Sequence, residues 1–144
     1  MYPVPIEKVA ATLGGERTLG ARLASVGDLH EAVRRGLPRE VVHELARAAA
    51  HGTDDRRRVA HLVASEATLK RSKVLSPTAS ERAERLARVV ALAHDAFGDP
   101  SQAQEWLHRP NAVLGAAPIV LAVTDLGARQ VEQVLANIEY GLPA

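Results

Sequence analysis

The sequence contains no cysteine, and this absence excludes several kinds of site at once. Disulfides, thiolate zinc sites and cysteine nucleophiles all require a residue that the chain does not have. Long apolar runs are also missing. The longest stretch without a charge covers the 15 residues 110–124, whereas a membrane helix needs about 20 apolar residues. The N-terminus lacks the basic-then-apolar pattern of a signal peptide, so we expect a cytoplasmic protein with no membrane contact.

Aromatic residues are scarce, while alanine is abundant with 26 of the 144 residues. Alanine is the strongest helix former, and its small side chain lets helices pack closely. Few segments show the period of two that indicates strands. We therefore predict an all-α fold. A shift in composition near residue 75 divides it into an N-terminal helical region over residues 1–75 and a C-terminal helical domain over residues 76–144.

Capping residues and glycines indicate where the helices begin and end. The longest helix is expected over residues 77–97, opened by a Ser-Pro pair and ended by a glycine. Another is expected over residues 125–140. Asp28 and Thr53 are predicted to cap two shorter helices, and Leu69 is predicted to be the buried residue of a third.

Charge of neither sign dominates the whole chain, which has 18 basic and 17 acidic residues and a net charge of +1. This balance excludes a polycationic tail. The charges are nevertheless segregated. Residues 56–73 carry a net charge of +5, and residues 94–144 carry −4. The near-neutral total therefore conceals a polar molecule with two differently charged ends.

The basic segment is predicted to form two short helices with a tight junction, as in a helix-turn-helix, whose second helix enters the DNA major groove. Arginine, lysine, serine and threonine side chains can contact phosphates or base edges. The candidate DNA-binding residues are Arg56, Arg57, Arg58, Ser65, Thr68, Lys70, Arg71 and Lys73. The turn is about one residue short and lacks the usual glycine. A solvated basic helix face is the alternative interpretation.

Catalytic patterns are few. Residues 40–43 and 105–108 both read Glu-x-x-His, the pair spacing of di-iron helix bundles, but the second pair lies on a helix too short for a bundle wall. We therefore interpret both pairs as polar surface groups. No Gly-x-Ser-x-Gly motif and no glycine-rich phosphate loop after a strand is present. We expect a binding protein without a catalytic site, metal or cofactor.

The acidic C-terminal part combines charge with apolar segments near helix ends. Phe97 and Trp106 are expected to pack in the core. The uncharged loop over residues 110–115 and the tail over residues 140–144 are too short to form a core of their own. Apolar segments of this kind favour contact with a protein partner.

A series of spaced positions covers residues 75–144: Leu75-Ser76-Pro77, Ala96-Phe97-Gly98-Asp99, Trp106-Leu107, Pro110-Asn111, Leu114-Gly115, Gly127-Ala128-Arg129, Val131-Glu132 and Ile138-Glu139-Tyr140-Gly141. Together these positions resemble the toxin-binding domain of the Xre/MbcA/ParS antitoxins. Upstream, Asp28-Leu29-His30, Gly36-Leu37-Pro38 and Ser65-Glu66 with Thr68-Leu69 are similar to the N-terminal region of the same family, apart from the shortened turn.

The resemblance implies a dimeric type II antitoxin. Its partner would be a RES-domain or ParT-like toxin that consumes NAD, either by degrading it or by transferring its ADP-ribose. The N-terminal region would bind operator DNA, and the C-terminal domain would occlude the toxin's active site. The toxin-contact residues carried over are Trp106, Pro110, Asn111, Leu114, Gly115, Glu132, Glu139, Tyr140 and Gly141. The alternatives are a dimeric helix-turn-helix regulator without a toxin partner and, ranked last, a metal-dependent helical enzyme.

Overall fold

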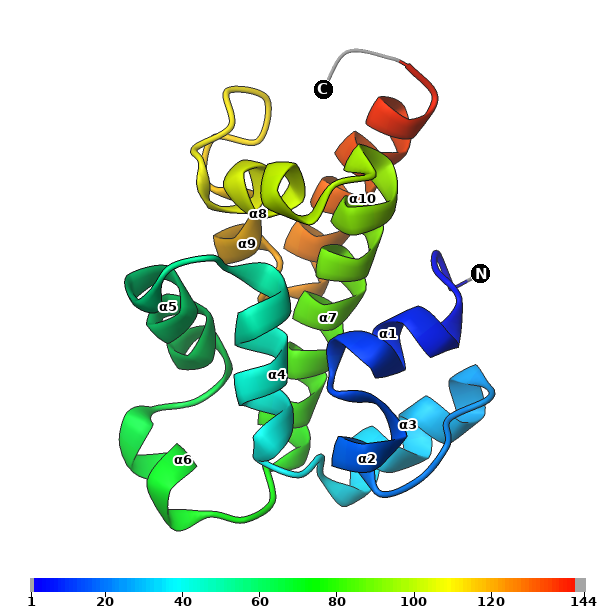
Figure 1. Ribbon diagram of the computed structural model, residues 1–144, viewed down its shortest axis with the longest axis vertical. Coiled ribbons are helices and arrows are strands. Elements are labelled where there is room, and N and C mark those ends of the chain that lie inside the picture. Colours follow the sequence, from blue (N-terminus) through cyan, green and yellow to red (C-terminus); the bar gives the residue numbers. More distant parts are fainter. Residues whose placement is uncertain (1, 142–144) are drawn as a thin grey trace.

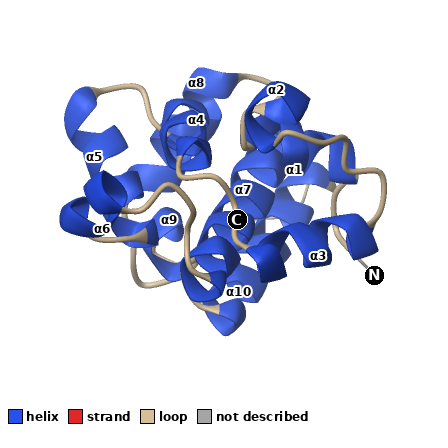
Figure 2. Cartoon of the chain, turned by 90° about the horizontal axis from the view of Figure 1, so that it is seen from below, coloured by secondary structure: helices blue, strands red, loops and turns tan. Residues whose placement is uncertain are grey.

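In the computed structural model, the described residues 2–141 form ten α-helices and no β-strand, which confirms the all-α prediction (Figures 1 and 2). The helices are α1 (Ile6–Thr12), α2 (Gly15–Leu19), α3 (Val26–Arg35), α4 (Glu40–Ala49), α5 (Thr53–Val63), α6 (Glu66–Arg71), α7 (Pro77–Phe97), α8 (Pro100–His108), α9 (Pro118–Leu121) and α10 (Asp125–Glu139).

Helix α7 runs through the middle of the molecule and has the limits predicted from the sequence (Figure 1). The Ser76 hydroxyl accepts a hydrogen bond from the Ala79 backbone N–H at 3.1 Å, and Gly98 ends the helix in the left-handed conformation. Alanines such as Ala83 and Ala87 are fully buried along it. Because these side chains are small, α10, α8, α1, α4 and α3 can all pack against α7.

A single hydrophobic core extends through both halves of the chain. Leu45 of α4 and Val63 of α5 belong to the same buried cluster as Leu86 of α7, Leu107 of α8 and Leu135 of α10. The division at residues 75 and 76 therefore does not separate two cores. This division of the chain remains a prediction about function. In the structure, helices of both parts pack against α7.

The segments that precede α4 and α7 are clipped together by backbone hydrogen bonds. Leu75 N–H donates to the Leu37 carbonyl at 2.8 Å, and Arg39 N–H donates to the Lys73 carbonyl at 3.0 Å. The hydroxyl of Ser80, a fully buried residue of α7, accepts from Leu37 N–H at 2.9 Å. These hydrogen bonds join the two ends of the stretch that contains α4, α5 and α6, and they hold this stretch against α7.

Two helix starts differ from the sequence prediction. The cap of α3 is Ser25, whose hydroxyl accepts from the Asp28 backbone N–H at 3.1 Å, so Asp28 lies inside the first turn rather than at the cap. The cap position of α5 is Gly52, and Thr53 is its first helical residue without a side-chain capping bond. Gly52 has extended backbone, which any residue adopts, so this cap position does not require a glycine.

Candidate functional site

The predicted helix-turn-helix is formed by α5 and α6, which are joined by only Ala64 and Ser65. The Ser65 hydroxyl accepts from the Thr68 backbone N–H at 3.2 Å and donates to the Thr68 hydroxyl at 2.9 Å. Both hydroxyls are therefore engaged in capping α6. The short junction expected from the sequence is present, and it is stabilised by these two predicted DNA-binding residues.

Helix α6 is attached to the rest of the molecule by Leu69, which packs against the core, and by polar contacts. None of its residues is buried, and Leu69, predicted to be buried, is only partly so. With barely two turns and a short junction, α6 cannot press a side chain into the core. Arg39, at the start of α4, instead donates from Nη1 to the carbonyls of Leu69 and Lys70 at 3.2 and 3.1 Å. Sequence reasoning missed Arg39 because a single arginine at a helix start carries no distinguishing pattern.

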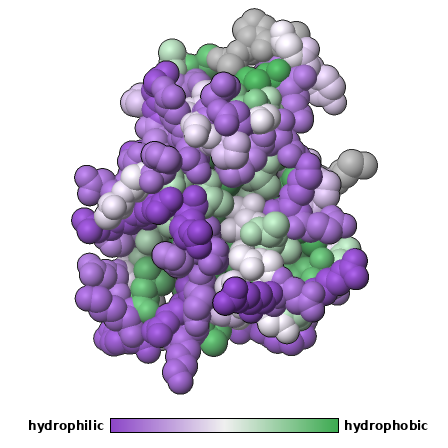
Figure 3. All heavy atoms as spheres, viewed as in Figure 1, coloured by the Kyte–Doolittle hydropathy of each residue, from purple (hydrophilic) through white to green (hydrophobic). Residues whose placement is uncertain are grey.

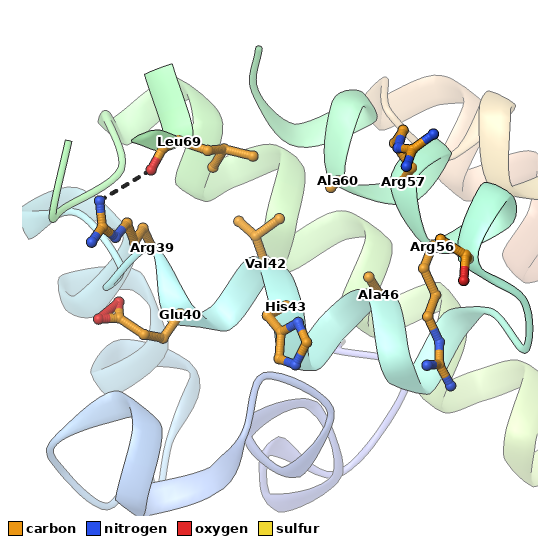
Figure 4. Close-up of a pocket in the computed structure, with 10 residues that line it drawn as sticks. Arg39, Glu40, Val42, His43, Ala46, Arg56, Arg57, Ala60 and Leu69 are labelled. Atoms are coloured by element: carbon orange, nitrogen blue, oxygen red, sulfur yellow. Dashed lines mark hydrogen bonds between the residues drawn. The ribbon is translucent and has the colours of Figure 1, made fainter. Parts of the chain in front are cut away.

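A groove with a volume of about 480 Å³ lies between α4, α5 and α6 (Figure 4). Its apolar lining comprises Val42, Ala46, Ala60 and Leu69, and its polar lining includes Arg39, Glu40, His43, Arg56 and Arg57. Figure 4 places Arg39 at one end of the groove, beside the carbonyl of Leu69, and Arg56 and Arg57 toward the other. Basic side chains therefore border a groove that is also lined by apolar side chains.

The eight predicted DNA-binding residues lie on α5, at the junction between α5 and α6, on α6 and in the segment directly after α6. Arg57, Lys70, Arg71 and Lys73 are exposed. Lys70 lies 3.2 Å from Glu66 and lowers the pKa of that carboxyl. Because both side chains of the pair are largely in water, it is weak and leaves Lys70 available to a phosphate. The backbone carbonyl of Ala50 accepts from Arg56, which therefore has a structural role as well.

A second exposed surface is formed by the loop between α8 and α9. The Asn111 side-chain oxygen accepts from the backbone N–H groups of Val113 and Leu114 at 2.9 and 3.1 Å, and Gly115 has a φ of +81°. These bonds fold the loop into a tight projection with Val113 69% exposed. Asn111 therefore shapes the loop, and Val113, absent from the predicted contacts, is its exposed apolar residue.

The end of α10 lies at the same end of the molecule as this loop (Figure 1). Glu139 and Gly141 are exposed, and Tyr140 is 81% exposed. Apolar residues gather on this end in the space-filling view (Figure 3). We call Pro110–Gly115 together with Glu139–Gly141 the C-terminal surface. Residues 142–144 of the predicted apolar tail lie outside the described residues.

Two predicted toxin-contact residues turn inward. Trp106 is partly buried against the core, and its ring centroid lies 5.7 Å from that of Phe97, as expected for core packing. Glu132 pairs with Arg88 of α7, with 2.7 Å between Oε1 and Nε, and only 17% of its side chain is exposed. The helix periodicity of α10 could not reveal this partner, which is 44 residues away.

The two Glu-x-x-His pairs lie at residues 40–43 and 105–108. Within residues 2–141, no group of three or more histidine, aspartate or glutamate side chains is placed to hold a metal ion. The surface interpretation is wrong for His108, whose side chain is 8% exposed. Its Nε2 donates to the Ala49 carbonyl at 3.0 Å. Over the same range, no helix is both long and apolar enough to cross a membrane.

Comparison with known proteins gives two matches to family models along the chain. Residues 28–88 match the antitoxin Xre-like helix-turn-helix domain, and residues 92–141 match the antitoxin Xre/MbcA/ParS C-terminal toxin-binding domain. A curated relative, "Antitoxin Xre" from Pseudomonas putida, is 27% identical over 120 residues, covering 83% of this chain and 76% of the relative. The first match contains α5 and α6, and the second contains the C-terminal surface.

Proposed function

The chain belongs to the Xre/MbcA/ParS family of antitoxins, and from that premise we propose that it neutralises an NAD-consuming toxin of the RES or ParT-like class. The C-terminal surface would occupy the toxin's NAD-binding cleft, and α5 with α6 would bind the operator of its own operon. We assign the chain itself no catalytic role.

The observation that carries the toxin part of the proposal is the exposed, largely apolar C-terminal surface, which includes the carboxylate of Glu139. A cleft that binds a dinucleotide is expected to present arginine or lysine to the pyrophosphate, and Glu139 offers a complementary charge. Tyr140 and Val113 are large exposed apolar side chains that a cleft could desolvate, as binding hot spots require. We leave Glu132 out of this contact surface because its carboxylate already pairs with Arg88.

The DNA part rests on the exposed cations of α5 and α6. Arg57, Lys70 and Arg71 are exposed on a short helix pair and can contact phosphates without first leaving a buried ion pair. The family's dimeric arrangement would place two such helix pairs on one duplex. A two-fold symmetric operator with two half-sites follows from that symmetry.

Co-expression with the protein encoded by the neighbouring reading frame tests the proposal. We expect the neighbouring protein to arrest growth when expressed alone, and this chain to restore growth and to co-purify with it. NAD levels measured in the same cells should fall during arrest and recover on rescue. If the neighbouring protein is harmless and does not bind, a dimeric transcriptional regulator without a toxin partner becomes the better account.

A further inference from the structure

The side chain of Arg39 donates hydrogen bonds to the last turn of α6. Its Nη1 donates to the carbonyls of Leu69 and Lys70 at 3.2 and 3.1 Å. The last carbonyls of a helix have no partner within that helix, so these two acceptors depend on donors from elsewhere. The helix dipole also favours a cation near the carboxyl end of a helix. A charged group from the start of α4 therefore completes the end of α6.

Helix α6 needs such support because it is short and little buried. It has six residues, none of which is buried, and Leu69 packs against the core while remaining partly exposed. A helix of this length is not stable in water by itself, because helix nucleation is unfavourable. The Ser65 hydroxyl caps its start by accepting from the Thr68 N–H at 3.2 Å. Its other end is held by Arg39.

Arg39 itself belongs to a firmly packed part of the molecule. It directly precedes α4, whose Val41 and Leu45 are fully buried in the core. Its backbone N–H donates to the Lys73 carbonyl at 3.0 Å, so the main chain and the side chain of one residue both contact the stretch that ends α6. Figure 4 shows its guanidinium turned toward the Leu69 carbonyl. Arg39 therefore ties the orientation of α6 to the core.

The orientation of a recognition helix affects its two kinds of DNA contact differently. Hydrogen bonds to base edges carry sequence specificity, and they weaken steeply when donor and acceptor are misaligned. Phosphate contacts carry no sequence information directly. Lys70 and Arg71 are exposed, and their long side chains can follow a phosphate when the helix tilts. A change in the tilt of α6 should therefore reduce discrimination between sequences more than affinity for DNA in general.

We propose that Arg39 is a positioning residue for DNA recognition, which sets sequence specificity by fixing the orientation of α6. This inference rests on the DNA part of the proposed function. Arg39 acts through the carbonyls of Leu69 and Lys70 and makes no phosphate contact of its own. Arg39 thus sets the preference for the operator, whereas the exposed cations Lys70 and Arg71 set the affinity for any duplex.

The test compares a duplex taken from the DNA immediately upstream of the gene with a duplex of the same bases in shuffled order. We expect the wild-type chain to bind the upstream duplex at least about a hundredfold more tightly. Arg39→Met removes the donors, so we expect this ratio to fall about tenfold, with the affinity for the shuffled duplex kept within about twofold and the salt dependence unchanged. Arg47→Met removes a 57% exposed arginine from α4 and should keep the wild-type ratio.

A second variant and a second measurement support the comparison. Arg39→Lys retains the charge and an N–H donor, so its ratio should lie closer to that of the wild type than the ratio of Arg39→Met does. Amide hydrogen exchange of the chain alone gives a readout that needs no DNA. The backbone N–H groups of Leu69 and Ser72 donate to carbonyls one turn earlier. They should exchange at least about threefold faster in Arg39→Met than in Arg47→Met.

The outcomes separate the role of Arg39 from the proposed function. If the wild-type chain discriminates between the duplexes and Arg39→Met keeps the same ratio, the positioning role is overturned and the proposed function stands. A loss of about one unit of salt slope also overturns it, because Arg39 would then contact a phosphate directly. Equal amide exchange in Arg39→Met and Arg47→Met does so as well. If the wild-type chain binds both duplexes alike, the DNA part of the proposed function fails, and the role of Arg39 fails with it.

Discussion

Arg88 of α7 and Glu132 of α10 form an ion pair in which Nε and Oε1 lie 2.7 Å apart, with 13% and 17% of the two side chains exposed. Arg88 also donates to Glu84 at 3.1 Å, and the Tyr2 hydroxyl donates to the same carboxylate at 2.7 Å. One guanidinium thus serves two carboxylates. Burial raises the pKa of Glu132, although Arg88 acts in the opposite direction.

Substituting Arg88 should lower the stability of the protein more than substituting Glu132. Arg88→Met leaves Glu84 and Glu132 largely buried without their guanidinium, and we expect the free energy of unfolding to fall by about 3 kcal/mol. Glu132→Gln removes a carboxylate that burial already disfavours, so we expect a change below about 1 kcal/mol. Urea unfolding at neutral pH measures both values. Equal losses for the two variants would contradict the shared-guanidinium arrangement.

His108 should make stability depend on pH. Burial lowers its pKa, because the folded protein disfavours the charged imidazole, and the nearby Asp55 only partly opposes this. The stabilisation from neutral His108 is therefore complete above the ordinary pKa of 6.5 and is lost as the pH falls below that value. We expect the free energy of unfolding to decrease less between pH 7.5 and 5.5 in His108→Gln than in wild type.

The control for this pH experiment is His30→Gln, which removes an exposed histidine of α3. This variant should retain the wild-type decrease. If His108→Gln and the control lose stability in parallel with wild type on acidification, His108 does not contribute the predicted pH dependence.

The double variant Lys70→Ala with Arg71→Ala should weaken binding to the upstream duplex and reduce its salt dependence. Each lost phosphate contact removes close to one unit from the slope of log affinity against log salt concentration, so we expect a decrease of about 2. Gel-shift titrations at several salt concentrations measure this slope. Arg17→Ala with Arg22→Ala removes two exposed charges elsewhere, and an identical effect there would show that α6 has no special role.

Local signals in the sequence were sufficient for most helices, because caps and glycines act within a few residues. Ser76 and Gly98 define α7 as predicted, and α10 ends at Glu139, one residue before the predicted end. The predictions for Thr53 and Asp28 were wrong because residues upstream take the cap positions, Gly52 directly before Thr53 and Ser25 three residues before Asp28. Such a choice depends on how the chain enters the helix.

The roles of individual site residues depended on partners far along the chain. Glu132 shares the predicted toxin-contact pattern with Glu139, but only Glu132 meets an arginine of α7. His108 belongs to a Glu-x-x-His pair that we interpreted as surface groups, but its ring bonds to the Ala49 carbonyl at the carboxyl end of α4, 59 residues away. The same holds for Arg39 and the carbonyls of α6. The sequence indicates which segments matter, while the fold decides which side chains remain available.

The central claim is that the C-terminal surface occludes the toxin's NAD site, and it is tested most directly by titrating this chain into NAD consumption by the toxin. The wild-type chain should abolish NAD consumption. Val113→Asp with Tyr140→Asp should leave the thermal unfolding midpoint unchanged, since both side chains are exposed, but should lose inhibition by at least about tenfold. Leu126→Asp, an equally exposed apolar site at the start of α10, should inhibit like wild type. Full inhibition by the double variant would contradict the claim.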